Sequence, residues 1–214
     1  MTENSNPLKS SNTELQGLNN LNIPNNVTCY AVIRSKGGSG ERHLINKLID
    51  KLPKNSKIFI CYENKLEMEP NFVSKFFSKP IEKIISQDEI SESVGGIINL
   101  NWRSQSEINK LLTVINKQTD DCIFIFAPGT SSGTTILDRI NCISSLCKNI
   151  FVSVDCLSEN SLNTAKNLSQ IENIEWDKIR FGCWKKTNSN ETTQHMLTIL
   201  NKEEIKSLEM GMSR

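Results

Sequence analysis

The chain has 214 residues, and its 25 Lys and Arg residues almost balance its 24 Asp and Glu residues. Because the formal net charge is only +1, there is no long-range positive field to hold nucleic acid, and we expect weak or no non-specific DNA binding. The longest apolar runs have the length of a strand, far below the roughly 20 residues that cross a bilayer, which argues against a membrane span.

The N-terminal segment, residues 1–26, is rich in Asn, Ser and Thr. It holds too few apolar side chains to offset the entropy lost on ordering, so we predict a flexible polar tail. The segment lacks the basic start and apolar middle of a secretory signal, and the seven cysteines fit no disulfide or zinc spacing. We therefore expect a cytoplasmic protein with structural thiols, and a single domain over residues 27–214.

From Val27 onward, apolar runs of strand length alternate with segments of helical period. The expected strands lie near 27–33, 57–62, 97–101, 122–127, 150–154 and 179–184. The expected helices carry apolar faces within 44–52, 108–115, 136–146 and 162–171. Nearly continuous apolar strands joined by crossover helices predict a three-layer, doubly wound α/β fold with a mostly parallel sheet.

Two stretches of the chain are less regular. Residues 63–93 mix Lys, Glu, Pro and Phe without a clean period, and we expect only a short helix at 73–77 there. The last stretch, 191–210, is expected to form one or two helices.

A glycine-rich loop connects the first expected strand to the first expected helix. It reads Lys36-Gly37-Gly38-Ser39-Gly40-Glu41-Arg42. Glycines in this position allow backbone N–H groups to converge on phosphate oxygens at a helix N-terminus. A plain turn between strand and helix is the alternative, because such turns also require glycine.

This loop resembles the deviant Walker motif K-G-G-x-G-K-S/T of the ParA/MinD family of P-loop ATPases. Lys36 matches the signature lysine, which in that family reaches across a nucleotide-sandwich dimer. Glu41 stands where the family has its second lysine, and Arg42 stands where it has the magnesium-holding Ser or Thr. A carboxylate about 4 Å from a phosphate charge repels it by roughly 4 kcal/mol at an effective dielectric of about 20. Tight binding of ATP in the usual pose is therefore not expected, unless Arg34 or Arg42 replaces the lysine and restores nucleotide binding. No metal site is assigned.

The resemblance extends along the chain from about residue 27 to 200. Cys61 and Glu63 align with the aspartate pair that follows the family's second strand. At the end of the fourth expected strand, Phe126 replaces an acid, and Pro128-Gly129 match the switch turn. Phosphoryl transfer depends on positioned cations and metal ligands, so the resemblance implies a pseudo-ATPase with little or no activity and no assigned catalytic residue.

The resemblance also implies a biological role. Members of the family partition plasmids or chromosomes or place cellular assemblies, and they act as dimers. We therefore expect a partition or positioning protein that forms a homodimer and binds a protein partner. A positioning factor of a pilus, secretion or cellulose-synthesis assembly is the alternative within the family.

A serine hydrolase is the alternative from another class. The segment Gly129-Thr130-Ser131-Ser132-Gly133 matches the nucleophile elbow G-x-S-x-G, with Ser131 as the nucleophile, and Asp155 and His195 follow in the required order. Against this interpretation, Pro128-Gly129 is explained by the switch turn, and His195 falls in an expected helix.

Overall fold

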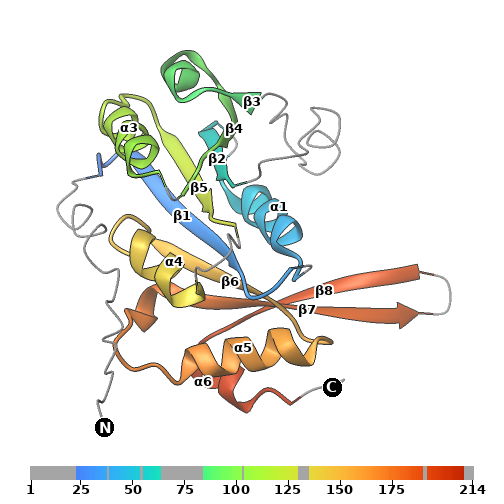
Figure 1. Cartoon of the computed structure of the whole chain (residues 1–214). Helices are drawn as coiled ribbons and strands as arrows, with labels where there is room; N and C mark the ends of the chain where they lie inside the picture. Colours follow the sequence, from blue (N-terminus) through green and yellow to red (C-terminus); the bar gives the residue numbers. More distant parts are fainter. Residues whose placement is uncertain are drawn as a thin grey trace, which may run out of the picture.

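A computed structural model of the chain describes residues 23–37, 39–53, 55–63, 84–102, 104–129, 135–189 and 192–209. Within these residues, eight strands form one sheet in the order β3-β4-β2-β5-β1-β6-β7-β8 (Figure 1). The strands are β1 (Val27–Arg34), β2 (Lys57–Tyr62), β3 (Ile84–Ile85), β4 (Gly95–Asn99), β5 (Cys122–Ala127), β6 (Asn149–Asp155), β7 (Ile179–Ser189) and β8 (Thr192–Leu200). Neighbouring strands are parallel, except that β7 and β8 are antiparallel.

Helices cover both faces of this sheet. They are α1 (Glu41–Lys51), α3 (Gln105–Asn116), α4 (Ile136–Ile143), α5 (Glu159–Ser169) and α6 (Lys202–Ser207), with 3-10 helices η2 (Gln87–Glu92) and η3 (Trp176–Lys178). Helix α1 lies on one face, whereas α3, α4 and α5 lie on the other (Figure 1). The predicted three-layer α/β class is thus confirmed. In the part of the chain that the structure describes, no helix combines the length and apolar character needed to cross a membrane.

The core has two apolar layers, one on each face of the sheet. On the α1 side, Ile45 and Ile49 belong to one buried cluster with Ile60. On the opposite side, the rings of Phe59 and Phe124 stack with their centroids 5.1 Å apart. Because both faces of the central strands are covered, these strands read as continuous apolar runs rather than as alternating ones.

The cysteines expected to be structural lie in this core. Cys29, Cys61, Cys122 and Cys183 are buried within β1, β2, β5 and β7, and all have free thiols. Burial raises the pKa of the Cys29 thiol to about 12, so it remains a neutral apolar group near neutral pH.

The last residues of the expected tail touch the domain. Ile23 packs against the core, and the Asn26 side chain donates hydrogen bonds to the carbonyl oxygens of Gln118 (3.1 Å) and Asp120 (2.6 Å). The structure therefore places residues 23–26 against the start of β1 and β5. Residues 1–22 of the expected tail lie outside the described residues.

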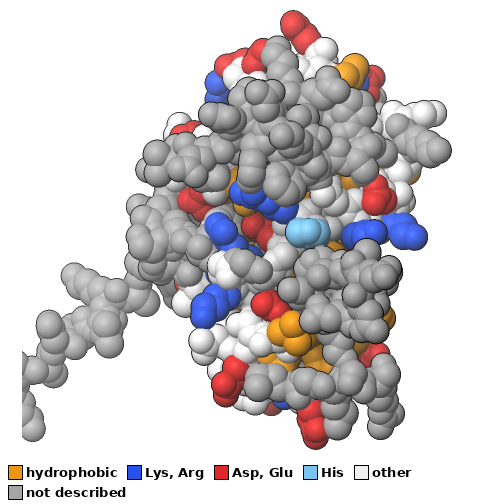
Figure 2. Space-filling view, turned by 90° about the vertical axis from the view of Figure 1, so that its right-hand side faces the viewer, with side chains coloured by type: hydrophobic (Ala, Val, Ile, Leu, Met, Phe, Trp, Pro, Cys, Tyr) orange, Lys and Arg blue, Asp and Glu red, His pale blue; other side chains and the backbone are white. Residues whose placement is uncertain are grey.

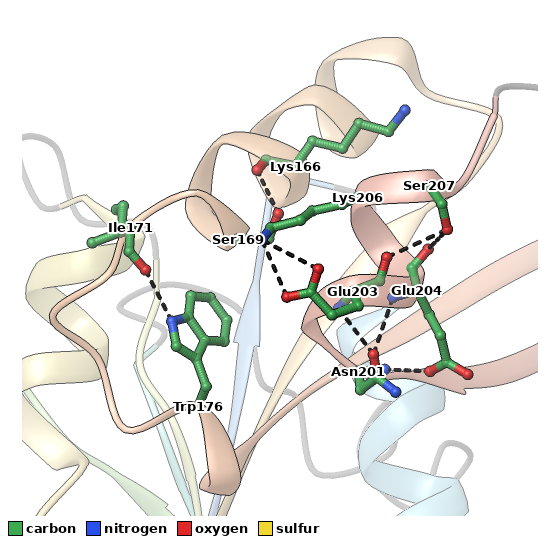
Figure 3. A network of polar contacts seen from close by, with 9 residues as sticks. All are labelled: Lys166, Ser169, Ile171, Trp176, Asn201, Glu203, Glu204, Lys206 and Ser207. Carbon is green, nitrogen blue, oxygen red and sulfur yellow. Dashed lines mark hydrogen bonds and ion pairs between the residues drawn. The ribbon is translucent and has the colours of Figure 1, made fainter.

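The C-terminal segment corrects one prediction. Instead of one or two helices over 191–210, the chain forms β8, which pairs with β7 from Phe181↔Leu200 to Ser189↔Thr192, and then the short helix α6. Tertiary pairing with β7 outweighs the helix-like spacing of apolar residues in this stretch, and the threonines favour a strand. Asn201 is the N-cap of helix α6, and its side chain accepts hydrogen bonds from the N–H groups of Glu203 and Glu204 (Figure 3).

The irregular stretch 63–93 is described only in part. Strand β3 and helix η2 occupy 84–92 and were not predicted. The helix expected at 73–77 lies outside the described residues.

Candidate functional site

The site lies where the sheet changes its winding direction. Strands β1 and β5 are neighbours, and the chain leaves β1 through α1 on one face but leaves β5 toward α4 on the other. In open α/β sheets, ligands bind outside the carboxyl ends of such a pair of strands. These ends carry Arg34, the last residue of β1, and Ala127, the last residue of β5, with Tyr62 at the end of the adjacent β2.

The glycine-rich loop has a defined backbone where it enters α1. Gly40 is the N-cap residue of α1 and has φ 80°, in the left-handed region that favours glycine. A Cβ atom on Gly40 would lie 2.7 Å from Cδ1 of Trp184, a buried residue of β7. Both the backbone conformation and the close indole ring therefore require glycine at this position.

Hydrogen bonds among four serines connect the loop to the neighbouring elements. The N–H of Ser35 donates to the carbonyl oxygen of Ser153 on β6 (3.0 Å), and the Ser153 hydroxyl donates to the carbonyl oxygen of Ser39. The hydroxyls of Ser35 and Ser161 share a hydrogen bond of 2.6 Å, which ties the loop to the first turn of α5. Buried hydrogen bonds therefore hold the described part of the loop against β6 and α5.

The requirement for glycine at residue 40 gives a direct prediction. We expect Gly40→Ala to lower the free energy of unfolding by about 2 to 4 kcal/mol, because a left-handed alanine costs about 1 to 2 kcal/mol and overlap with Trp184 adds to it. Gly37→Ala is the matched control, since a Cβ atom there meets nothing within 4 Å. Urea unfolding of both variants tests this, and equal stabilities would contradict the described loop.

Glu41 is buried in the first turn of α1. Its side chain is only 5% exposed, and Oε2 accepts a hydrogen bond of 3.3 Å from the hydroxyl of Tyr62. Nε of Arg34 lies 3.9 Å from the same oxygen, and Arg42 hydrogen-bonds to the Tyr62 side chain. The other oxygen, Oε1, is buried without a hydrogen-bond partner among the described residues. A carboxylate therefore sits at the base of the loop.

Burial has a marked effect on this carboxyl. Desolvation raises the pKa of Glu41 to about 7, although the charge of Arg34 and the hydrogen bond from Tyr62 act in the opposite direction. Glu41 thus titrates close to neutral pH, and above pH 7 it adds a negative charge beside the glycine-rich loop.

Three further predicted site residues, Glu63, Pro128 and Gly129, lie close to the start of the loop. Gly129 lies against Glu63 and Arg34, because a Cβ atom on Gly129 would be 2.9 Å from Oε2 of Glu63 and 3.2 Å from Nη2 of Arg34. Pro128 and Gly129 are buried. From α4, Nη1 of Arg139 donates to the carbonyl oxygen of Arg34 (3.4 Å). The structure thus brings together Glu63, the Pro128-Gly129 turn and the start of the loop.

A cavity of about 340 Å³ opens beside Glu41. Its lining residues are Arg34, Ser39, Gly40, Glu41, Arg42, His43 and Tyr62. Figure 2 shows basic side chains around the pale-blue histidine on this face. The arginines can attract an anion, but the buried carboxylate opposes a phosphate at the base. Among the described residues, no three His, Cys, Asp or Glu side chains are grouped so that they could hold a metal ion.

The other predicted site residues have different surroundings. Lys36 and Gly37 are exposed, and Gly38 lies outside the described residues. Ser131 of the hydrolase alternative also lies outside them. His195 belongs to β8 rather than to the expected helix, since its backbone pairs with Lys186.

Sequence reasoning missed several residues of the site. They are Tyr62, Arg139, Ser153 and Ser161. The contact of Trp184 with Gly40 of the loop was missed as well. Two of them carried a signal: Arg139 is a charge on the apolar stripe of its helix, and Ser153 is a polar residue inside an apolar strand. Both patterns indicate a buried polar contact, because such groups need a partner in a core.

Comparison with the models of known protein families gives no match, and comparison with curated proteins finds no similar sequence.

Proposed function

We propose that this protein is a ParA/MinD-like partition or positioning protein that works as a pseudo-ATPase. It acts by forming a homodimer and binding a protein partner, and hydrolysis of ATP is not part of its action. The observation that carries the proposal is the buried carboxylate of Glu41 at the N-terminus of α1, where a nucleotide-binding loop of this type presents a lysine.

The surroundings of Glu41 support a loop that is maintained without nucleotide. Arg34 and Tyr62, which face the carboxylate, are already engaged with it. The serine hydrogen bonds at Ser35 and Ser39 fix the loop backbone from behind. Such a domain keeps the backbone of its phosphate loop in place but lacks the positive charge that binds phosphate. It can still bind partners through its surface, although it does not transfer a phosphoryl group.

The charge balance supports a protein as the partner. With a formal net charge of +1, the chain has no excess of basic residues with which to follow DNA through its phosphates. We therefore propose that the domain finds its position by binding a specific surface of a protein partner rather than DNA. Lys36, which is exposed on the loop, is our candidate for contact with that partner.

The proposal predicts a defined position in the cell. A fluorescent fusion of the full chain, expressed at its natural level in the source cell, is expected to form discrete foci. Lys36→Ala is expected to disperse the foci, whereas Lys47→Ala, which changes another exposed lysine on α1, should leave them in place. Uniform fluorescence of the natural chain, together with unchanged positioning of cell contents after deletion of its gene, contradicts the proposal.

A further inference from the structure

Strand β8 forms one edge of the sheet and is unusually regular. Among the described residues it hydrogen-bonds to β7 alone, and all nine of its residues pair with β7 in continuous register. Figure 1 shows β7 and β8 as a long hairpin that extends past α1. The outward backbone N–H and C=O groups of such a strand are in position to pair with another strand.

Strand β8 lacks the features that usually prevent an edge strand from pairing with another chain. Natural edge strands are short, bulged, or marked by charged residues or proline. Residues 192–200 read TTQHMLTIL, with no Lys, Arg, Asp, Glu or Pro. The opposite edge of the sheet is different, because β3 has only two residues.

Apolar side chains are exposed on both sides of the β8 edge. Met196 is 54% exposed and Ile199 is 44% exposed. Because side chains alternate along a strand, these two point to opposite faces of the sheet. A strand that paired with β8 would therefore bury an apolar side chain on each face.

We propose that β8 pairs with β8 of a second copy of this chain. The two strands run antiparallel across a two-fold axis and join the two sheets into one. An identical strand fits this edge because antiparallel self-pairing is two-fold symmetric and uses one surface twice. Electrostatic repulsion between two copies is small, because β8 contains no Lys, Arg, Asp or Glu and the chain has a formal net charge of only +1. The short β3 offers no second long edge, so assembly stops at the dimer.

The inference deepens the homodimer part of the proposed function by naming its surface. In the family that the sequence resembles, the dimer encloses nucleotide at the loop. A chain whose Glu41 opposes phosphate needs an interface that does not depend on nucleotide, and the described lining of the loop cavity includes no residue of β8. The pairing of β8 follows from the sheet edge alone and holds whether or not the loop binds phosphate.

Sedimentation velocity of the full chain without nucleotide tests the pairing. We expect the natural chain to have twice the mass of one chain at micromolar concentration. Met196→Lys and, separately, Thr198→Lys are expected to raise the dissociation constant of the dimer at least tenfold. Each variant brings two lysines, one from each copy, close together across the paired strands, and their charges repel each other. Val94→Lys, at a residue that is 85% exposed and distant in sequence from β8, is the control and should remain dimeric.

Hydrogen exchange locates the interface in the same samples. The amides of residues 192–200 should exchange more slowly at concentrations that favour the dimer, and this difference should vanish in Met196→Lys. A natural chain that stays monomeric at about 100 µM, that forms open assemblies, or whose two lysine variants remain dimeric overturns the inference. A natural chain that stays monomeric would also remove the homodimer from the proposed function, whereas a dimer whose two lysine variants stay dimeric would overturn the β8 pairing alone. Positioning by a protein partner is judged separately, by the cellular foci.

Discussion

The double variant Glu41→Lys, Arg42→Ser is expected to bind MgATP, in contrast to the natural chain. The change replaces the buried carboxylate with an ammonium group and supplies a hydroxyl for magnesium. At about 4 Å and an effective dielectric of about 20, the interaction with one phosphate charge moves from roughly 4 kcal/mol unfavourable to roughly 4 kcal/mol favourable. Even a quarter of that difference, about 2 kcal/mol, strengthens binding about 30-fold.

Thermal unfolding measures this gain. Without nucleotide, the variant should melt below the natural chain, because the new lysine lies beside Arg34. With MgATP at about 100 times its Kd, its melting temperature should rise by about 5 to 10 °C. Glu203→Lys with Lys206→Ser makes the same net charge change on the exposed side of α6 and should show no rise. An equal response of both double variants to ATP would contradict the role of Glu41.

The second large effect is a pH-dependent gain of stability in Glu41→Gln. The carboxyl titrates near its ordinary 4.5 in the unfolded chain and at about 7 in the folded one, chiefly because of burial. Between these values the folded chain holds a proton that the unfolded chain has released, so the free energy of unfolding falls as the pH rises through this range. The glutamine side chain keeps an acceptor for Tyr62 but does not titrate. We expect the stability of the variant relative to the natural chain to rise by about 3 kcal/mol from about pH 4.5 to above pH 7.

Urea unfolding at a series of pH values from about 5 to 8 tests this, because the effect of all other groups cancels in the difference between the two chains. Glu203→Gln is the control, since this carboxylate lies on the surface in an ion pair with Lys206. Its difference from the natural chain should stay within about 0.5 kcal/mol at every pH. A difference for Glu41→Gln that is independent of pH would show that the carboxyl is not desolvated.

Most of the fold could be predicted because local pattern and tertiary position agree. The central strands, such as 57–62 and 122–127, are continuous apolar runs, and burial on both faces is the reason for that pattern. Helix α3 was predicted from apolar residues at helical spacing, which its buried face requires. Strand β8 was missed because Met196, Leu197, Ile199 and Leu200 also have helical spacing, and only pairing with β7 selects the strand.

The site was predictable in its loop but not in its supporting contacts. The glycines, Glu41 and the Pro128-Gly129 turn are adjacent to the ends of predicted strands, so their meeting at one edge of the sheet follows from the fold class. Ser161 lies 126 positions from the serine that it holds, and no local pattern joins them. The burial of Glu41 depends likewise on Tyr62 and Arg34, which come from two different strands.

We propose that the buried carboxylate of Glu41 prevents nucleotide from binding to the loop. Calorimetric titration of the natural chain with MgATP at about pH 8, above the pKa of about 7 for Glu41, tests it most directly. The expected result is no saturable heat up to about 1 mM nucleotide, which is a binding free energy weaker than about 4 kcal/mol. A saturable isotherm with a Kd of about 50 µM or below would contradict the proposal and show that the loop binds nucleotide.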